Sequence, residues 1–241
     1  MIVLLHGWPG DPEDWSAVGV DAVVPELLWR HDVSAATLAD YVAELIDDPA
    51  VVGGYDIGSR VAQTLARTRP ELVKALVLAP PLPGAGDRVL NPDAQREFWY
   101  QAFHQLALAE QLIDGDRDAV RAYLKHFWDH WSGPGFALPD DHLERLVDRY
   151  AEPGAFTKSI GWYRSGSGMV AQSLAETAPA TRIERPTTVL WPEHDPLFPR
   201  AWGDRLHEFF EDVTVTDLPG AGHFSPLEAP EAWARALQRR T

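Results

Sequence analysis

Short apolar runs alternate with amphipathic helical segments along the first third of the chain, and this alternation limits the fold more than any other feature of the sequence. The predicted strands cover residues 1–5, 21–27, 51–54 and 73–78. The predicted helices cover residues 34–46 and 60–69. Strands and helices in this order are typical of a parallel sheet with helices on both faces, so the sequence predicts an α/β fold.

The middle of the chain has a different pattern. Residues 92–178 contain aromatic-rich helical segments, such as REFWYQAFHQLALAEQL and AVRAYLKHFWDHW, and no convincing strand. Strand patterns return at residues 187–191 and 212–218, and a last helix is expected over residues 230–240. The sequence therefore predicts a core made of residues 1–91 and 179–241, interrupted by a helical cap, or lid, at residues 92–178.

Charge and cysteine content exclude several classes of function. The formal net charge of −15 repels the phosphates of nucleic acids and of anionic membranes. The absence of cysteine excludes disulfides, thiolate catalysis and cysteine-ligated zinc. The N-terminal MIVLLHGWPG lacks the features of a signal peptide, and no apolar run reaches the roughly 18 residues of a membrane span. A cytoplasmic protein is the default expectation.

A tight turn with Asp56 at its centre joins the strand at residues 51–54 to the following helix. In the turn GYDIG, Gly54 and Gly58 relieve the backbone crowding of a sharp strand-to-helix connection. The side chain between them points out over the edge of the sheet, close to backbone N–H groups that stabilise negative charge. This is the geometry of a nucleophile elbow with Asp56 as the nucleophile, although the pattern alone also fits an ordinary turn with a capping aspartate.

Three further loops that follow predicted strands hold the groups that such a nucleophile needs. After the first strand, HGWPG could direct the Trp8 N–H toward the same cavity as the Ile57 N–H, and two such donors make an oxyanion hole. In GAGHF, His223 could act as a general base. In WPEHDP, Asp195 is the predicted carboxylate that orients His223, with Glu193 as the alternative.

The order nucleophile, acid, histidine resembles that of the α/β-hydrolase superfamily, and the motifs resemble its epoxide hydrolase branch in particular. HGWPG, GYDIGSRVA, WPEHDPLFP and GAGHFSPLEAPE carry this resemblance, which covers nearly the whole chain. The resemblance implies a mostly parallel sheet flanked by helices and a cap inserted after the fourth predicted strand. No P-loop or dinucleotide motif appears, so no cofactor is expected. The first two strands of the typical sheet are missing from this sequence, and a homodimer is one arrangement that would cover the exposed edge.

The resemblance also assigns two residues of the lid. Epoxide hydrolases use two lid tyrosines to hold the epoxide oxygen and to protonate it as the ring opens, and Tyr100 and Tyr163 match these positions. Without the resemblance, each would be an ordinary aromatic residue on an amphipathic helix. The implied reaction opens an epoxide to a vicinal diol through a covalent ester on Asp56. The aromatic lid suggests an apolar or aromatic small-molecule substrate.

Two alternatives remain open at this stage. A haloalkane or haloacid dehalogenase would use the same Asp-His-Asp triad, but Ile57 stands where the haloalkane type often has tryptophan, and Tyr100 stands where the fluoroacetate type has a lid histidine. A non-catalytic binding protein with this fold is the other alternative, against which the intact triad argues. His126 and His130 lie one helical turn apart, but no third ligand follows, so no metal is expected.

Overall fold

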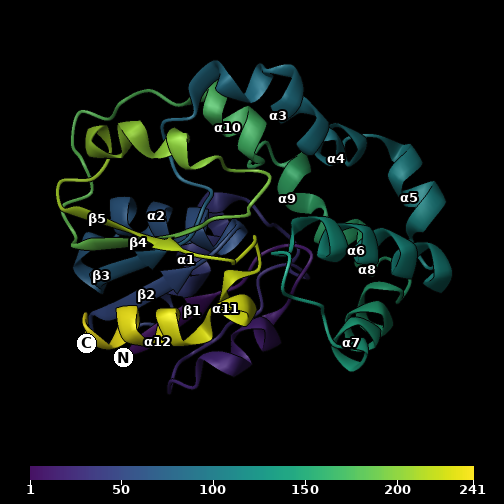
Figure 1. The fold of residues 1–241 in the computed structure, drawn as a ribbon, viewed down its shortest axis with the longest axis horizontal. Helices are drawn as coiled ribbons and strands as arrows, with labels where there is room; N and C mark the ends of the chain where they lie inside the picture. Colours follow the sequence, from purple (N-terminus) through teal and green to yellow (C-terminus); the bar gives the residue numbers. More distant parts are fainter.

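Five strands form one parallel sheet in the computed structural model, which describes residues 1–241 (Figure 1). The strands lie side by side in chain order: β1 (Ile2–Leu5), β2 (Ala50–Gly54), β3 (Val73–Leu78), β4 (Thr187–Pro192) and β5 (Val213–Leu218). Each neighbouring pair is parallel. Every residue of β2 is buried, as expected for a strand covered on both faces. The predicted α/β fold is confirmed.

Helices cover the two faces of this sheet. On one face lie α1 (Ala35–Ala43) and α2 (Ile57–Thr68), and on the other lie α11 (Ser225–Glu228) and α12 (Pro230–Gln238) (Figure 1). Neighbouring residues of a strand point to opposite faces, and β2 follows this rule. A Cβ atom added to Gly53 would lie 3.3 Å from a methyl group of Leu237 in α12, whereas one added to Gly54 would lie 2.5 Å from the carbonyl oxygen of Gly58 in α2.

The run at residues 21–27, which was expected to form a strand, makes a single bridge to β1 instead. The Val23 N–H donates to the Ile2 carbonyl at 3.0 Å, and the Leu4 N–H donates to the Val23 carbonyl at 2.9 Å. The next bond of a parallel ladder would need the N–H of Pro25, which proline lacks. The prediction of a strand was therefore wrong, because one proline stops the ladder after one bridge.

Residues 92–178, the segment expected to form a lid, contain eight helices and no strand, and they lie to one side of the sheet (Figure 1). The helices are α3 (Pro92–Glu97), α4 (Trp99–Phe103), α5 (Ala107–Ile113), α6 (Arg117–Trp131), α7 (Asp140–Tyr150), α8 (Ala155–Ser159), α9 (Gly161–Arg164) and α10 (Met169–Ala175). That they act as a separate cap domain stays a prediction. No helix anywhere in the structure has both the length and the apolar character needed to cross a membrane.

Four short 3₁₀ helices complete the chain. They are η1 (Pro12–Val18), η2 (Pro70–Leu72), η3 (Gly86–Leu90) and η4 (Arg200–Glu208). The loops that follow β1, β2, β4 and β5 leave the sheet at its carboxyl edge, because all strands are parallel. Side chains on these four loops can therefore meet at one place, beneath the helices of residues 92–178.

Candidate active site

The turn between β2 and α2 holds Asp56 in a strained backbone conformation. Asp56 has a φ of 49° and a ψ of −125°, and no other residue except glycine has a positive φ. The turn is crowded, because a Cβ atom added to Gly58 would lie 2.0 Å from the carbonyl oxygen of Leu5 in β1. Only glycine lets the first turn of α2 approach β1 so closely. Strain of this kind persists where the surrounding structure fixes a functional side chain.

The Asp56 carboxylate lies between a backbone donor and a histidine. The Trp8 N–H donates to Asp56 Oδ1 at 2.8 Å, and His223 Nε2 lies 3.4 Å from Asp56 Oδ2. On the far side of the ring, His223 Nδ1 lies 2.9 Å from Asp195 Oδ2. The Ile57 N–H belongs to the first residue of α2, where backbone donors have no partner within the helix. Asp56, His223 and Asp195 thus form one continuous chain of contacts.

The contacts of Asp195 and Glu193 distinguish these two carboxylates, which the sequence left as alternatives for the triad acid. Asp195 is buried, and its second oxygen accepts from the Leu197 N–H at 2.9 Å. Glu193 is exposed and accepts from the Gly220 N–H at 2.9 Å rather than from the imidazole. Of Asp195 and Glu193, only Asp195 contacts His223, so it is the carboxylate with the geometry of a triad acid.

The two carboxylates that contact His223 favour its positively charged form. Burial by itself lowers the pKa of the imidazole, but the carboxylates of Asp195 and Asp56 more than offset this and raise the pKa to about 10. The side chain is fully enclosed, and its Nε2 has no hydrogen-bond partner. The charge on Asp56 therefore helps to keep His223 protonated, and a change in that charge changes the basicity of the ring.

Beside Asp56 lies a small cavity that brings Tyr100 and Tyr163 into the site. Asp56, Ile57, Tyr100 and Tyr163 all line this cavity, whose volume of about 10 Å³ is close to that of a single water site. Tyr100 comes from α4 and Tyr163 from α9, and their ring centroids lie 5.5 Å apart with the rings nearly perpendicular. Burial is the main cause that raises the pKa of each phenol well above its usual value, and the charge of Asp56 adds to it. Both therefore keep their O–H protons at neutral pH.

An aromatic cluster holds these tyrosines in place. The indole of Trp8 stacks on Tyr100, with ring centroids 5.7 Å apart, and meets Tyr163 edge-on at 5.8 Å. His104 packs 4.7 Å from the Tyr163 ring and places its Nε2 2.9 Å from the Tyr123 hydroxyl. The loop that carries the Trp8 N–H is thus packed directly against the helices that carry the phenols.

Replacing His104 with glutamine is expected to make the fold less sensitive to acid. Burial, and then the charge of Arg164, lower the pKa of His104 to about 3, compared with 6.5 when unfolded. The unfolded chain therefore binds the extra proton below pH 6.5, so this contribution to stability is present above pH 6.5 and is lost as the pH falls toward 3. Between pH 7 and pH 5, the unmodified protein should lose about 2 kcal/mol more free energy of unfolding than His104→Gln.

Urea unfolding of both proteins at the two pH values measures this difference. Glutamine can still hydrogen bond to Tyr123, so the packing of the cluster is largely kept. Equal losses of stability in the two proteins would show that His104 is not a buried neutral imidazole.

Glu228 is a site residue that the sequence analysis missed. Its Oε2 accepts from the N–H groups of Gly133 and Gly222, each at 2.7 Å, and its Oε1 accepts from the Phe224 N–H at 3.0 Å. The His223 N–H itself donates to the carbonyl of Trp131, at the end of α6, at 2.8 Å. The histidine loop is therefore held jointly by α11 and by residues that follow α6. Only the position of the glutamate, five residues after His223, could have drawn attention to it.

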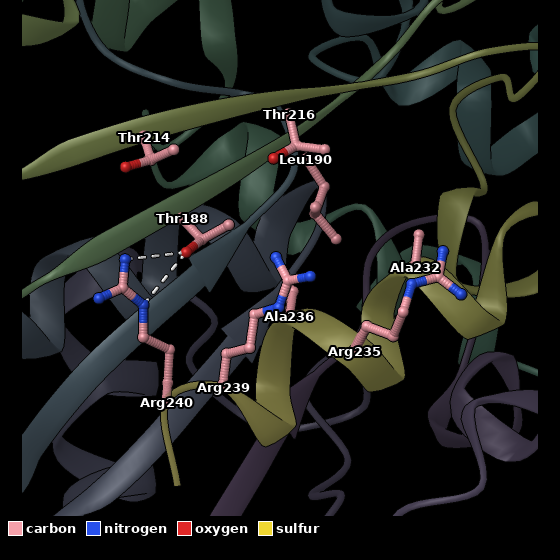
Figure 2. Close-up of a pocket in the computed structure, with 9 residues that line it drawn as sticks. All are labelled: Thr188, Leu190, Thr214, Thr216, Ala232, Arg235, Ala236, Arg239 and Arg240. Atoms are coloured by element: carbon pink, nitrogen blue, oxygen red, sulfur yellow. Dashed lines mark hydrogen bonds between the residues drawn. The ribbon is translucent and has the colours of Figure 1, made fainter.

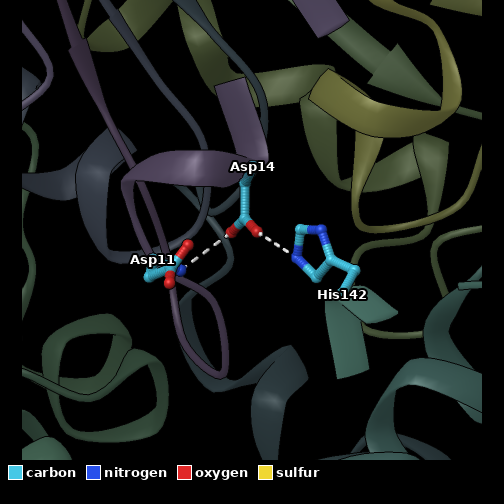
Figure 3. A group of neighbouring side chains, drawn as sticks. All are labelled: Asp11, Asp14 and His142. Carbon is cyan, nitrogen blue, oxygen red and sulfur yellow. Dashed lines mark hydrogen bonds and ion pairs between the residues drawn. The ribbon is translucent and has the colours of Figure 1, made fainter. Parts of the chain in front are cut away.

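One group of side chains has the composition of a metal site. Asp11, Asp14 and His142 lie close together, with ligand atoms within 4.8 Å of one another (Figure 3). The Arg145 guanidinium forms an ion pair with Asp11 and lies 3.0 Å from His142 Nε2, and the Tyr55 hydroxyl donates to Asp14. A guanidinium already supplies the positive charge that a metal ion would bring. The cluster is an ionic contact between η1 and α7, and its residues do not fit a metal.

A larger hollow of about 350 Å³ lies away from Asp56, between β4, β5 and α12 (Figure 2). Arg235, Arg239 and Arg240 line it, and the Arg240 guanidinium donates to Thr188 Oγ1 at 3.2 and 3.1 Å. These arginines lie at the C-terminal end of α12, where positive charges stabilise the helix dipole. None of the candidate catalytic residues lines this hollow.

Residues 2–236 of the chain match the family profile described as "Alpha/beta hydrolase family". The chain belongs to the alpha/beta hydrolase family. This alpha/beta hydrolase is 28% identical over 258 residues to the soluble epoxide hydrolase of Corynebacterium sp., covering 95% of this chain and 86% of that protein. It is 25% identical over 267 residues to the pyrrolizixenacetamide deacetylase of Xenorhabdus hominickii, covering 98% of this chain and 89% of that protein.

Solved structures show the same fold. The Bacillus megaterium epoxide hydrolase, determined in complex with an inhibitor, matches this alpha/beta hydrolase with a TM-score of 0.80 at 18% identity, covering 99% of this chain and 92% of that chain. One relative is named for epoxides and another for an acetamide, so similarity establishes the family and the fold. The choice of reaction depends on the residues of the site.

Proposed function

We propose that this alpha/beta hydrolase is an epoxide hydrolase that opens an epoxide to a vicinal diol through a covalent ester on Asp56. One observation carries the proposal: the residue at the elbow is an aspartate, and two neutral phenols, Tyr100 and Tyr163, line the same cavity. A carboxylate that displaces a C–O bond forms an ester, and water can cleave that ester at its carbonyl carbon. A serine in the same reaction would form an ether, which offers no carbonyl carbon.

In the first step, an Asp56 carboxylate oxygen attacks one epoxide carbon from the side opposite the C–O bond. That bond breaks, and the departing oxygen takes a proton from Tyr100 or Tyr163. The hydrogen bonds from the two phenols strengthen as charge develops on the oxygen, which lowers the barrier rather than only tightening binding. The product of this step is a hydroxyalkyl ester.

Formation of the ester also prepares the base. Asp56 loses its negative charge when it is alkylated, so one of the two carboxylates that raise the pKa of His223 disappears. His223 then loses its proton as the tyrosine regains one, which closes the proton balance of the first step. The neutral imidazole, still held by Asp195 at 2.9 Å, is ready to accept a proton from water.

In the second step, His223 removes a proton from water, and the hydroxide attacks the carbonyl carbon of the ester. The N–H groups of Trp8 and Ile57 hold the resulting oxyanion. Trp8 N already lies 2.8 Å from Asp56 Oδ1, which is within the range of an oxyanion-hole donor. The intermediate then releases the diol, whose oxygen takes up the second proton of the water, and His223 and Asp56 return to their charged forms.

A single turnover in H₂¹⁸O tests this route. The oxygen added to the first diol comes from Asp56, so the first diol should contain no ¹⁸O, and the label should appear in the Asp56 carboxylate. Mass spectrometry of the diol and of the peptide that contains Asp56 provides both measurements. Label in the first diol would mean that water attacks the epoxide directly.

Replacing Tyr100 or Tyr163 with phenylalanine is expected to lower kcat for epoxide opening by about 100-fold, because each change removes one donor to the developing oxygen charge. Tyr123→Phe is the matched control, since Tyr123 lies in the same aromatic cluster but does not line the cavity. Steady-state kinetics on styrene oxide measures all three variants. Unchanged turnover in both cavity variants would remove the phenols from the mechanism.

A dehalogenase with the same triad would release halide from a haloalkane or haloacid. Assays of halide release and of diol formation on the same preparation distinguish the two reactions. The tyrosine pair favours epoxide hydrolysis, because the two O–H groups can donate to one oxygen that must gain a proton. A halide ion leaves without gaining a proton.

A further inference from the structure

Two outer hollows adjoin the Asp56 cavity, and each shares a different wall with it. The first, which we call the α4–α10 groove, lies between these helices, has a volume of about 230 Å³ and shares Gln101 and Tyr163 with the cavity. The second, the α2–α10 hollow, has a volume of about 270 Å³ and shares Arg60 with the cavity. A substrate could reach Asp56 through either wall, so the contacts of Gln101 and Arg60 decide between the two.

The wall toward the α2–α10 hollow is fixed. Arg60 is buried, its Nη1 forms an ion pair with Glu176 at 3.2 Å, and its Nη2 donates to the carbonyl of Leu82 at 3.1 Å. Glu176 in turn accepts from the Gly84 N–H at 3.0 Å. Passage of a substrate here would break a largely buried ion pair and leave a charge without its partner, which is costly.

The wall toward the α4–α10 groove consists of two neutral residues, Gln101 and Tyr163, and Gln101 is the one that bonds to α10. Gln101 is buried, its Nε2 donates to the Tyr100 hydroxyl at 3.2 Å, and its Oε1 accepts from the Val170 N–H at 3.1 Å. The bond to Val170 joins α4 to the start of α10 across the seam between these helices, whereas the bond to Tyr100 lies within α4. Breaking neutral hydrogen bonds costs less than leaving a buried charge without its partner, so Gln101 is easier to displace than Arg60.

We propose that uncharged epoxides reach Asp56 through the α4–α10 groove, with Gln101 as the gate and as the residue that positions the Tyr100 hydroxyl. This proposal rests on the proposed function for the identity of the substrate, but the route itself does not depend on it. None of the nine residues that line the groove carries a charge, whereas Arg60, Arg67 and Glu176 line the other hollow. A neutral groove in a chain with a net charge of −15 favours uncharged molecules over anions.

The gate also acts on the chemistry through Tyr100. Because Gln101 donates to the phenol oxygen, it occupies a lone pair and leaves the O–H proton free to point at the epoxide. A substrate that enters would displace Gln101. When the side chain returns, its amide again donates to the Tyr100 hydroxyl. The width of the seam should then set the largest epoxide that the site accepts.

The chain has no cysteine, so one introduced thiol reports access to the cavity without any catalysis. Ser167 lines the Asp56 cavity and is buried, so Ser167→Cys places a thiol there, and Met169→Cys is the second reporter. The probe is uncharged methyl methanethiosulfonate, and the labelling rate is measured by mass spectrometry of the intact protein. Its sulfonate-bearing ethyl analogue tests the effect of charge.

Two alanines of α10, four residues apart, provide a matched pair of obstructions. Ala171 is exposed and lines the α4–α10 groove, while Ala175 is exposed and lines the α2–α10 hollow. Ala171→Trp should slow labelling by about tenfold or more, since a bulky ring in a narrow passage excludes even small molecules. Ala175→Trp should leave labelling unchanged, and the anionic probe should label the unobstructed protein more slowly than the neutral one.

Gln101→Ala gives a second signature that loss of structure alone would not produce. It should raise the labelling rate, because the wall is removed, and lower kcat on styrene oxide, because Tyr100 loses its donor. Slower labelling in Ala175→Trp, equal rates in both tryptophan variants, or no labelling of either reporter would overturn the α4–α10 route. None of these outcomes depends on whether the protein hydrolyses epoxides, so failure of the route and failure of the proposed function are separate results.

Discussion

Replacing Asp56 with asparagine is expected to lower the turnover of every epoxide by at least about 10⁴-fold, as for other nucleophiles that act as part of a catalytic unit. The amide cannot attack the epoxide carbon, so no ester forms. The fold should be preserved, because the asparagine oxygen can still accept from the Trp8 N–H, which lies 2.8 Å from Asp56 Oδ1. Diol formation, measured by chromatography, gives the rate.

The matched control is Glu193→Gln. It makes the same change from carboxylate to amide in an exposed loop of the site, at a residue that contacts Gly220 rather than His223. Its turnover should stay close to that of the unmodified protein. A covalent role for Asp56 would be refuted if Asp56→Asn kept more than a tenth of the activity. Its unfolding temperature must equal that of the unmodified protein for this comparison to hold.

Replacing His223 with glutamine should stop the reaction after the first step. The ester forms, but no base activates water, so kcat should fall by at least about 10⁴-fold and each protein molecule should retain one substrate molecule. Intact-protein mass spectrometry should show an increase equal to the mass of the epoxide. This result would separate alkylation from hydrolysis, because only the second step needs the imidazole as a base.

The double variant Asp56→Asn with His223→Gln controls for non-specific alkylation and should acquire no added mass. If His223→Gln acquires no adduct either, while the unmodified protein hydrolyses the same epoxide, the covalent intermediate is wrong. Water would then have to attack the epoxide directly, with His223 positioning the water molecule.

The sequence predicted a parallel sheet because each strand is a short apolar run that ends in a loop with distinctive residues. Asp56, His223 and Asp195 follow three different strands, and parallel strands bring such loops to one edge. The same reasoning did not predict the single bridge at Val23. The apolar content of this run predicted a strand, but Pro25 lacks the N–H that a longer ladder needs.

Other parts of the candidate site depend on contacts that no local pattern reveals. The choice of Asp195 over Glu193 needs the distance to His223, since both residues follow β4 within three positions. Gln101 gains its position only because α10, nearly 70 residues later in the chain, offers the Val170 N–H. Such residues look like ordinary polar side chains of a helix until the tertiary packing is known.

The Glu228 contacts make the helical segment a poor candidate for exchange as a module. Glu228 binds both Gly133, just after α6, and the loop that carries His223, and the Trp131 carbonyl accepts from the His223 N–H. A chimera that grafts residues 92–178 from a relative onto this sheet would have to reproduce the backbone at residues 131–133 as well as the substrate-facing helices. Engineering a new specificity is better directed at single positions along the seam of α4 and α10 than at wholesale replacement of the segment.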